Sequence, residues 1–158
     1  VILMKKILSS LIMFSTLSSI SMGATYMTSA KGNGINVRTS PTTKSRVVKV
    51  VPSGDIVNSD ERSGNWYKVE SVDSESEYNG YIHNSLLKPV TERNVLPNGN
   101  TNVRAAGSLK SKVIGKVNSE DVIYTIGNKN KGWYHVRLSK YQANGKKFGY
   151  IHESRFQD

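Results

Sequence analysis

The chain contains few side chains that could carry out acid–base or metal chemistry. Its three histidines are His83, His135 and His152, and it has no cysteine. His83 and His152 lie in matching sequence blocks, so they could share a metal ion only if the two blocks met symmetrically, and His135 has no second ligand at a usual spacing. The missing cysteine excludes thiolate catalysis and cysteine-ligated zinc. We therefore predict no metal site and no cofactor.

Three acidic residues, Asp73, Glu75 and Glu77, alternate with other residues in a polar stretch at 70–79. Two carboxylates on a rigid frame could act as general acid and base, but we expect these three to be solvated in a soft loop. The chain also lacks a serine nucleophile elbow and a histidine–glutamate zinc helix. We therefore predict no catalytic residue and a non-enzymatic protein.

The elements that carry these side chains occur twice. Three blocks, at residues 36–38, 66–69 and 80–85, recur in the same order at residues 102–104, 133–136 and 149–154. The offsets are 66, 67 and 69 residues, so each copy is one small domain and much longer than a solenoid unit. We place the first domain at residues 25–90 and the second at 91–158.

Strand patterns dominate both copies. Short β-branched runs occur at residues 47–51 and 113–117, and large apolar residues alternate with polar ones at 66–71 and 133–138. About five short strands in each copy predict an all-β fold of two five-stranded barrels in tandem. A segment at residues 88–100, with Pro89 and Pro97, is expected to connect them.

Most of the repeated residues have a structural interpretation. Asn in each Asn-Val-Arg block is expected to bond a turn, and Arg to lie along the barrel beside an acid or a carbonyl. Gly80 and Gly149 indicate positions where a side chain would not fit. The predicted core residues are Val37, Val69, Ile82, Val103, Val136 and Ile151.

Positive charge is concentrated in the second copy. Residues 25–90 contain eight Lys or Arg and seven Asp or Glu, whereas residues 91–158 contain twelve and five. Lys140, Lys146 and Lys147 take the place of the acidic residues of the first copy. Such a basic surface could serve solubility or could attract an anionic polymer, and the sequence leaves both interpretations open.

The first residues indicate a leader segment. Lys5 and Lys6 precede an apolar stretch at residues 7–22, and small residues follow near Gly23 and Ala24. This pattern predicts a signal peptide at residues 1–24, cleaved after Gly23 or Ala24. A single membrane anchor is the alternative, although the stretch is short and contains six serines. We expect an exported protein, periplasmic or extracellular and wall-associated, with no membrane span after cleavage.

Taken in order, the motifs resemble the bacterial Src-homology-3 (SH3b) domain. The series runs Asn-Val-Arg, Ser-x-Val-Ile/Val, Asp-Ile/Val, Trp-Tyr-x-Val and Gly-Tyr-Ile-His-x-Ser, and it covers residues 35–88 and 101–156. Each motif alone is unspecific, but the ordered set occurs twice. The resemblance implies two SH3-like barrels in an exported bacterial protein. Such modules commonly target enzymes or receptors to the cell wall, where they bind peptidoglycan or its peptides.

The resemblance also implies where a ligand would bind. The first aromatic residue of Trp-Tyr-x-Val corresponds to one that lines the ligand groove of eukaryotic SH3 domains, which makes Trp66 and Trp133 candidate ligand-binding residues. Tyr81 and Tyr150 are further candidates, because rigid aromatic surfaces bind peptides or sugars at little entropic cost. Alternatively, the tryptophans close the core and the tyrosines cap the barrel.

Polyproline recognition is not expected. The eukaryotic groove needs a tyrosine-rich first loop, a proline and a later tyrosine, and the two copies here have Asn-Val-Arg, a histidine, and Leu86 or Arg155 at these places. We predict instead a module that binds peptidoglycan or another anionic envelope polymer. An adaptor or inhibitor for an exported protein partner is the alternative. Nucleic acid is not expected, because no nucleic-acid motif is present and export argues against it.

Overall fold

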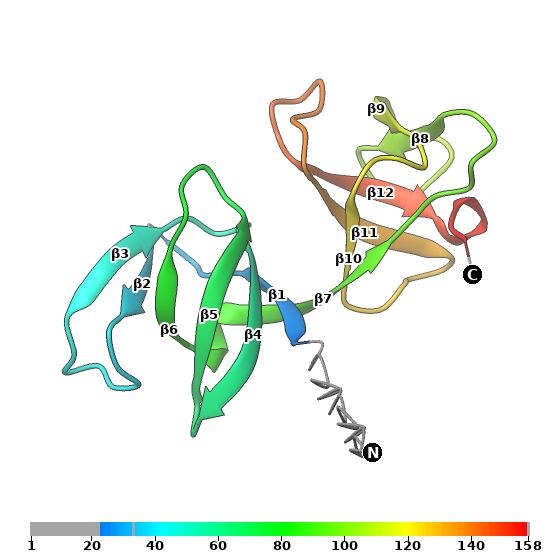
Figure 1. Cartoon of the computed structure of the whole chain (residues 1–158). Coiled ribbons are helices and arrows are strands. Elements are labelled where there is room, and N and C mark those ends of the chain that lie inside the picture. Colours follow the sequence, from blue (N-terminus) through cyan, green and yellow to red (C-terminus); the bar gives the residue numbers. More distant parts are fainter. Residues whose placement is uncertain (1–22, 33, 158) are drawn as a thin grey trace, which may run out of the picture.

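A computed structural model of the protein describes residues 23–32 and 34–157, and these form antiparallel β-structure with two 3-10 turns (Figure 1). The first half contains β1 (Ala24–Thr28), β2 (Ile35–Arg38), β3 (Val47–Val51), β4 (Ile56–Ser63), β5 (Trp66–Asp73), β6 (Asn79–His83) and the turn η1 (Asn84–Leu86). The second half contains β7 (Leu87–Arg93), β8 (Thr101–Arg104), β9 (Val113–Val117), β10 (Ile123–Ile126), β11 (Trp133–Leu138), β12 (Phe148–His152) and the turn η2 (Glu153–Arg155). The predicted all-β tandem fold is confirmed.

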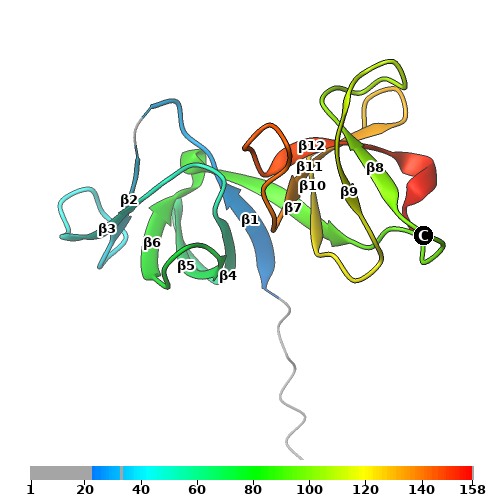
Figure 2. The ribbon, with the colours of Figure 1, turned by 90° about the horizontal axis from the view of Figure 1, so that it is seen from above.

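Each half contains one set of five strands with a further strand before it. The strands are hydrogen-bonded in the order β3-β2-β6-β5-β4-β1-β7-β10-β11-β12-β8-β9. We call β1–β6 the first barrel and β7–β12 the second barrel. Figure 2 shows β1 and β7 lying side by side between them. The two barrels therefore share a continuous line of strand pairing.

Strand β7 was not expected from the sequence, which assigned residues 88–93 to a connector. It pairs with β1, where Met27 lies opposite Lys88, and with β10, where Tyr124 lies opposite Glu92. The predicted domain boundary between residues 90 and 91 falls inside this strand. The chain thus passes from one barrel to the other through paired backbone.

Three clusters of buried side chains hold the fold together. One lies in each barrel, and all six predicted core residues are at most 2% exposed. The third cluster is formed by residues from both barrels, namely Met27, Ile56, Val90 and Tyr124. Burial of apolar surface is the main favourable term in association, so this cluster fixes the barrels against each other.

Gly80 and Gly149 confirm the predicted close approach of backbone. Gly80 has a φ of +149°, and a Cβ there would lie 2.7 Å from the carbonyl oxygen of Arg38. A Cβ at Gly149 would overlap the side chain of Val103. Each glycine therefore allows a close approach between strands, of β6 to β2 in the first barrel and of β12 to β8 in the second.

The predicted signal peptide lies almost wholly at residues 1–22, outside the described residues. Within residues 23–32 and 34–157, no helix is long and apolar enough to cross a membrane. The described chain begins at Gly23, directly before β1.

Candidate ligand-binding grooves

An arginine closes the loop after the first repeated strand of each barrel. Arg38 Nη1 donates hydrogen bonds of 2.8 Å to the carbonyl oxygens of Thr43 and Ser45. Arg104 Nη1 makes the two matching bonds in the second barrel, both 3.0 Å long. The prediction that these arginines lie beside carbonyl groups is confirmed. Their bonds fix the loop that forms one side of the groove described below.

His83 and His152 position the two tryptophans. Each histidine precedes a 3-10 turn, and its Nδ1 accepts a hydrogen bond of 3.3 Å from the backbone N–H two residues later. The ring then meets a tryptophan edge-on, with centroids 5.2 Å apart for Trp66–His83 and for Trp133–His152. This capping role of the two histidines was not predicted from the sequence. The His-x-Ser spacing at the start of the turn was the available signal.

Trp133 lines a groove of about 510 Å³ in the second barrel. His152 lies beside it, Arg104 is the last residue of β8, Leu109 comes from the β8–β9 loop, and Arg155 comes from η2. This loop packs close to the indole, since a Cβ at Gly107 would lie 3.1 Å from Trp133 Cβ. The groove therefore combines an aromatic surface with two guanidinium groups and an exposed leucine.

The matching region of the first barrel has a different border. Thr43 stands where the second barrel has Leu109, and Leu86 stands where it has Arg155. Trp66 is half-buried like Trp133, and neither tryptophan belongs to a buried core cluster of the described residues. The same aromatic framework thus has a less cationic border in the first barrel. The ligand-binding role of both tryptophans stays a prediction.

Tyr81 and Tyr150 lie on the same outer faces as the tryptophans. Each is two residues before the capping histidine on its strand, and residues two apart in a strand point to the same side. Tyr150 stacks on His135 with centroids 4.9 Å apart, and Tyr81 lies opposite Lys68. Both tyrosines are half-buried. Their predicted role in binding is not tested by these contacts.

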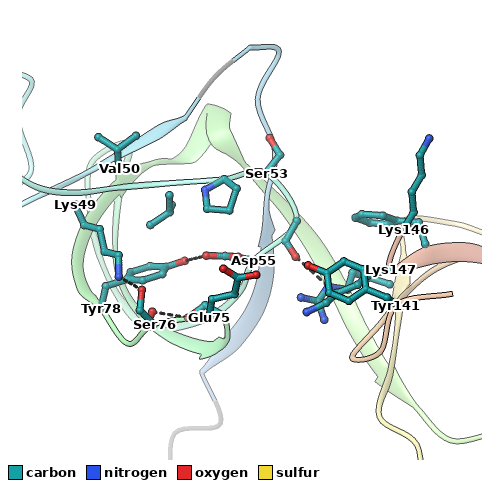
Figure 3. Close-up of a pocket in the computed structure, with 16 residues that line it drawn as sticks. Lys49, Val50, Ser53, Asp55, Glu75, Ser76, Tyr78, Tyr141, Lys146 and Lys147 are labelled. Carbon is teal, nitrogen blue, oxygen red and sulfur yellow. Dashed lines mark hydrogen bonds between the residues drawn. The ribbon is translucent and has the colours of Figure 1, made fainter. Parts of the chain in front are cut away.

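The three lysines predicted as one basic surface fall into two places. Lys140 lies 3.5 Å from the carboxylate of Asp121 in its own barrel. Lys146 and Lys147 line a second groove, of about 610 Å³, that lies between the barrels (Figure 3). Lys147 lies over the ring of Tyr141 at 4.9 Å.

Asp73 was expected to be a solvated loop residue, and that prediction is wrong. It is the last residue of β5, and its carboxylate accepts a hydrogen bond of 2.5 Å from Arg137 Nη1 of the second barrel. Burial alone would raise the pKa of Asp73, but the hydrogen bond and charge of Arg137 hold it below the ordinary value. The residue is therefore an anionic anchor between the barrels.

Arg137 was not singled out from the sequence. It is only 2% exposed, and its Nε donates a hydrogen bond of 3.0 Å to the carbonyl oxygen of Gly54. Phe148 packs onto the same glycine, where a Cβ would come within 3.2 Å of the ring. No repeated motif marks Arg137, because the matching position of the first barrel holds Glu70. The difference between Glu70 and Arg137 in the two copies was the only signal in the sequence for this role.

Asp55 is a second residue that the sequence analysis did not select. It is 8% exposed, and the hydroxyl of Tyr78 donates a 3.0 Å hydrogen bond to its Oδ2. Burial raises the pKa of Asp55, even though the bond from Tyr78 acts in the opposite direction. Asp55 lines the groove between the barrels.

Comparison with known proteins identifies one family. The family described as Bacterial SH3 domain matches at residues 33–88 and 99–157. Among solved structures, NlpC2 from Trichomonas vaginalis is 13% identical with a TM-score of 0.37, over 89% of this chain and 49% of that one. NlpC1 from Trichomonas vaginalis is 14% identical with a TM-score of 0.38, over 89% of this chain and 48% of that one. This chain thus spans about half the length of each. No curated protein matches it.

Proposed function

This chain belongs to the bacterial SH3 domain family, and we propose that it is an exported, non-enzymatic module that binds cell-wall material. Domains of this family are binding domains. Peptidoglycan peptides are the proposed ligand class, and other anionic envelope polymers are the wider class. The groove at Trp133 is the observation that carries the proposal.

The groove at Trp133 has the chemistry for such a ligand. An indole positioned by His152 offers contact area without a large loss of side-chain entropy on binding. Arg104 and Arg155 border it, and guanidinium groups bind carboxylates well, through paired hydrogen bonds. Peptides of the cell wall carry free carboxylates, so the groove suits them better than a neutral chain.

The charge of the second barrel supports the same proposal. Lys and Arg exceed Asp and Glu by seven in residues 91–158, and by one in residues 25–90. A basic field raises the rate at which anionic polymers are captured, and salt weakens this attraction. We therefore assign the main wall contact to the second barrel.

Export rests on the leader pattern at residues 1–24. Cleavage after Gly23 would leave β1 intact, because that strand begins at Ala24. This strand pairs with both β4 and β7, so it is needed where the barrels meet. Periplasmic and extracellular, wall-associated locations both agree with the proposal.

Sedimentation with purified peptidoglycan tests the proposed function. We expect the mature chain to co-sediment at low salt and Trp133→Ala to reduce its affinity about tenfold, as for a central aromatic contact residue. Trp66→Ala is the matched control and should have a smaller effect, with circular dichroism showing that both variants are folded. Wild-type protein that stays in the supernatant at low salt contradicts the proposal, and so does unchanged binding of both variants. Crosslinking to a stoichiometric exported partner without wall binding would favour the adaptor role instead.

A further inference from the structure

The groove between the barrels is built from charges of opposite sign. Its first wall comes from the β3–β4 turn and the β5–β6 loop, and its second wall comes from the hairpin between β11 and β12. Figure 3 shows Asp55, Glu75 and Tyr78 on the first wall and Tyr141 and Lys147 across from them. The volume of about 610 Å³ is large enough for a short peptide.

The first wall presents carboxylates. Asp55 is 8% exposed and held by the hydroxyl of Tyr78, whereas Glu75 is exposed on the β5–β6 loop. Lys49 is held against the same wall, because its Nζ bonds the hydroxyl of Ser76 and lies 5.5 Å from the ring centre of Tyr78. Glu75 is therefore the accessible anion here, with Asp55 behind it.

The second wall presents a cation and an aromatic ring. Tyr141 is 64% exposed, and Lys147 Nζ lies 4.9 Å from its ring centre. Lys146 lies at the rim of the same groove. An exposed tyrosine beside an ammonium group can contact both the aliphatic part and the carboxylate of a ligand.

The two walls are held at a fixed spacing. Arg137 bonds Gly54 and Asp73 from across the interface, and the shared cluster around Val90 and Tyr124 is buried beneath. A ligand therefore meets charges that are already positioned, which lowers the entropic cost of binding.

We propose that the groove between the barrels binds short peptides with a free ammonium and a free carboxylate. The ammonium would lie at Glu75 and Asp55, and the carboxylate would lie at Lys147. Pro52 and Phe148 supply apolar surface for the part between them. The carboxylates of this groove can pair with an ammonium group, whereas no carboxylate of the described residues lines the groove at Trp133, so the two sites differ in ligand. The proposal does not depend on wall binding at that groove.

Titration with three related tripeptides tests the ligand class. NMR chemical-shift perturbation measures the affinity of each peptide. The first is Ala-Lys-Ala with free termini. The second lacks ammonium groups, because glutamine replaces lysine and the amino terminus is acetylated, and the third lacks the carboxylate, because its C-terminus is an amide. We expect each change to weaken binding at least about threefold, the effect of losing a partly exposed ion pair. Shifts should centre on Tyr141 and Glu75. Equal affinity for all three peptides would overturn the proposal, and so would the absence of shifts at the groove.

Variants on the two walls identify the charges that matter. Glu75→Gln should remove the preference for the free ammonium, while Glu77→Gln, in the same loop but not among the residues lining the groove, should keep it. Lys147→Gln should remove the preference for the free carboxylate, while Lys140→Gln, paired with Asp121, should keep it. An unchanged preference in both wall variants would overturn the proposal.

The groove at Trp133 provides an independent control. Trp133→Ala should leave tripeptide binding unchanged, because the indole lines the other groove. Wild-type protein that binds the tripeptide but not peptidoglycan would contradict only the function proposed for the groove at Trp133. Loss of tripeptide binding in Trp133→Ala would overturn the assignment of two separate sites.

Discussion

Glu70 is exposed in the first barrel, whereas Arg137, at the matching position of the second barrel, is buried and bonded to Gly54 and Asp73. The two strands begin alike, with Trp-Tyr-x-Val, and Glu70 and Arg137 follow directly, where the other barrel covers β11. This difference between the copies therefore marks the surface where the barrels meet.

The residues that position the tryptophans, in contrast, are the same in both barrels. Each barrel has an arginine that closes a loop and a histidine that caps a turn and meets an indole at 5.2 Å. These contacts need nothing from the other barrel, so both copies keep them. The copies differ instead at the border of the groove, where Thr43 and Leu86 of the first barrel correspond to Leu109 and Arg155 of the second.

Substitution of Arg137 and of Glu70 should produce the largest difference in the free energy of unfolding. Arg137→Ala is expected to lower the free energy of unfolding by about 3 kcal/mol, because it leaves the carboxylate of Asp73 and the carbonyl of Gly54 without their partner. The matching Glu70→Ala should change it by less than about 0.5 kcal/mol, since that side chain is exposed. Urea unfolding of both variants measures the contrast. Similar losses in the two variants would contradict the assignment of Arg137 to the interface.

Much of each barrel could be predicted from the sequence, because its signals are local. Val69 and Val136 follow their tryptophans by three residues and alternate with polar neighbours, and both are buried as expected. Gly80 and Gly149 were likewise recognisable from their place before a strand. These features depend only on strand periodicity and backbone space within one copy.

The contact between the barrels could not be predicted, because it overrides local patterns. Arg137 and Leu138 are adjacent in β11 and both buried, which breaks the alternation of a half-exposed strand. Pro89 argued against a strand at residues 88–93, yet it lies opposite Tyr26 in the pairing of β7 with β1. The first exception exists because the other barrel covers Arg137, and the second because β1 supplies a pairing partner for β7.

The two capping histidines should behave alike. His83→Ala and His152→Ala are each expected to lower the free energy of unfolding by about 1 kcal/mol, the usual value of one hydrogen bond. Each should also shift the tryptophan emission, because the edge contact with the indole is lost. Thermal unfolding and fluorescence measure the two effects. A loss confined to one barrel would contradict the view that the cap is part of the shared framework.

The smallest expected effect concerns pH and distinguishes His135 from Lys68 at the matching position. Burial, and then the charge of Lys88, lowers the pKa of His135 from its ordinary value of 6.5, so the folded state favours the neutral ring that stacks on Tyr150. As the pH falls below 6.5, the unfolded chain takes up this proton before the folded one does, and the free energy of unfolding decreases.

His135→Gln should remove the contribution of this histidine to the pH dependence of the free energy of unfolding, while the contribution of the carboxylates stays in place. The expected result is a smaller decrease in the free energy of unfolding between pH 7 and pH 5 than in the wild type, measured by urea unfolding. Lys68→Gln is the matched control, since Lys68 is exposed and lies 3.6 Å from Glu61. If both variants keep the wild-type dependence on pH, burial of His135 does not contribute to it, and the aromatic stack in the second barrel is as tolerant of charge as the exposed position in the first.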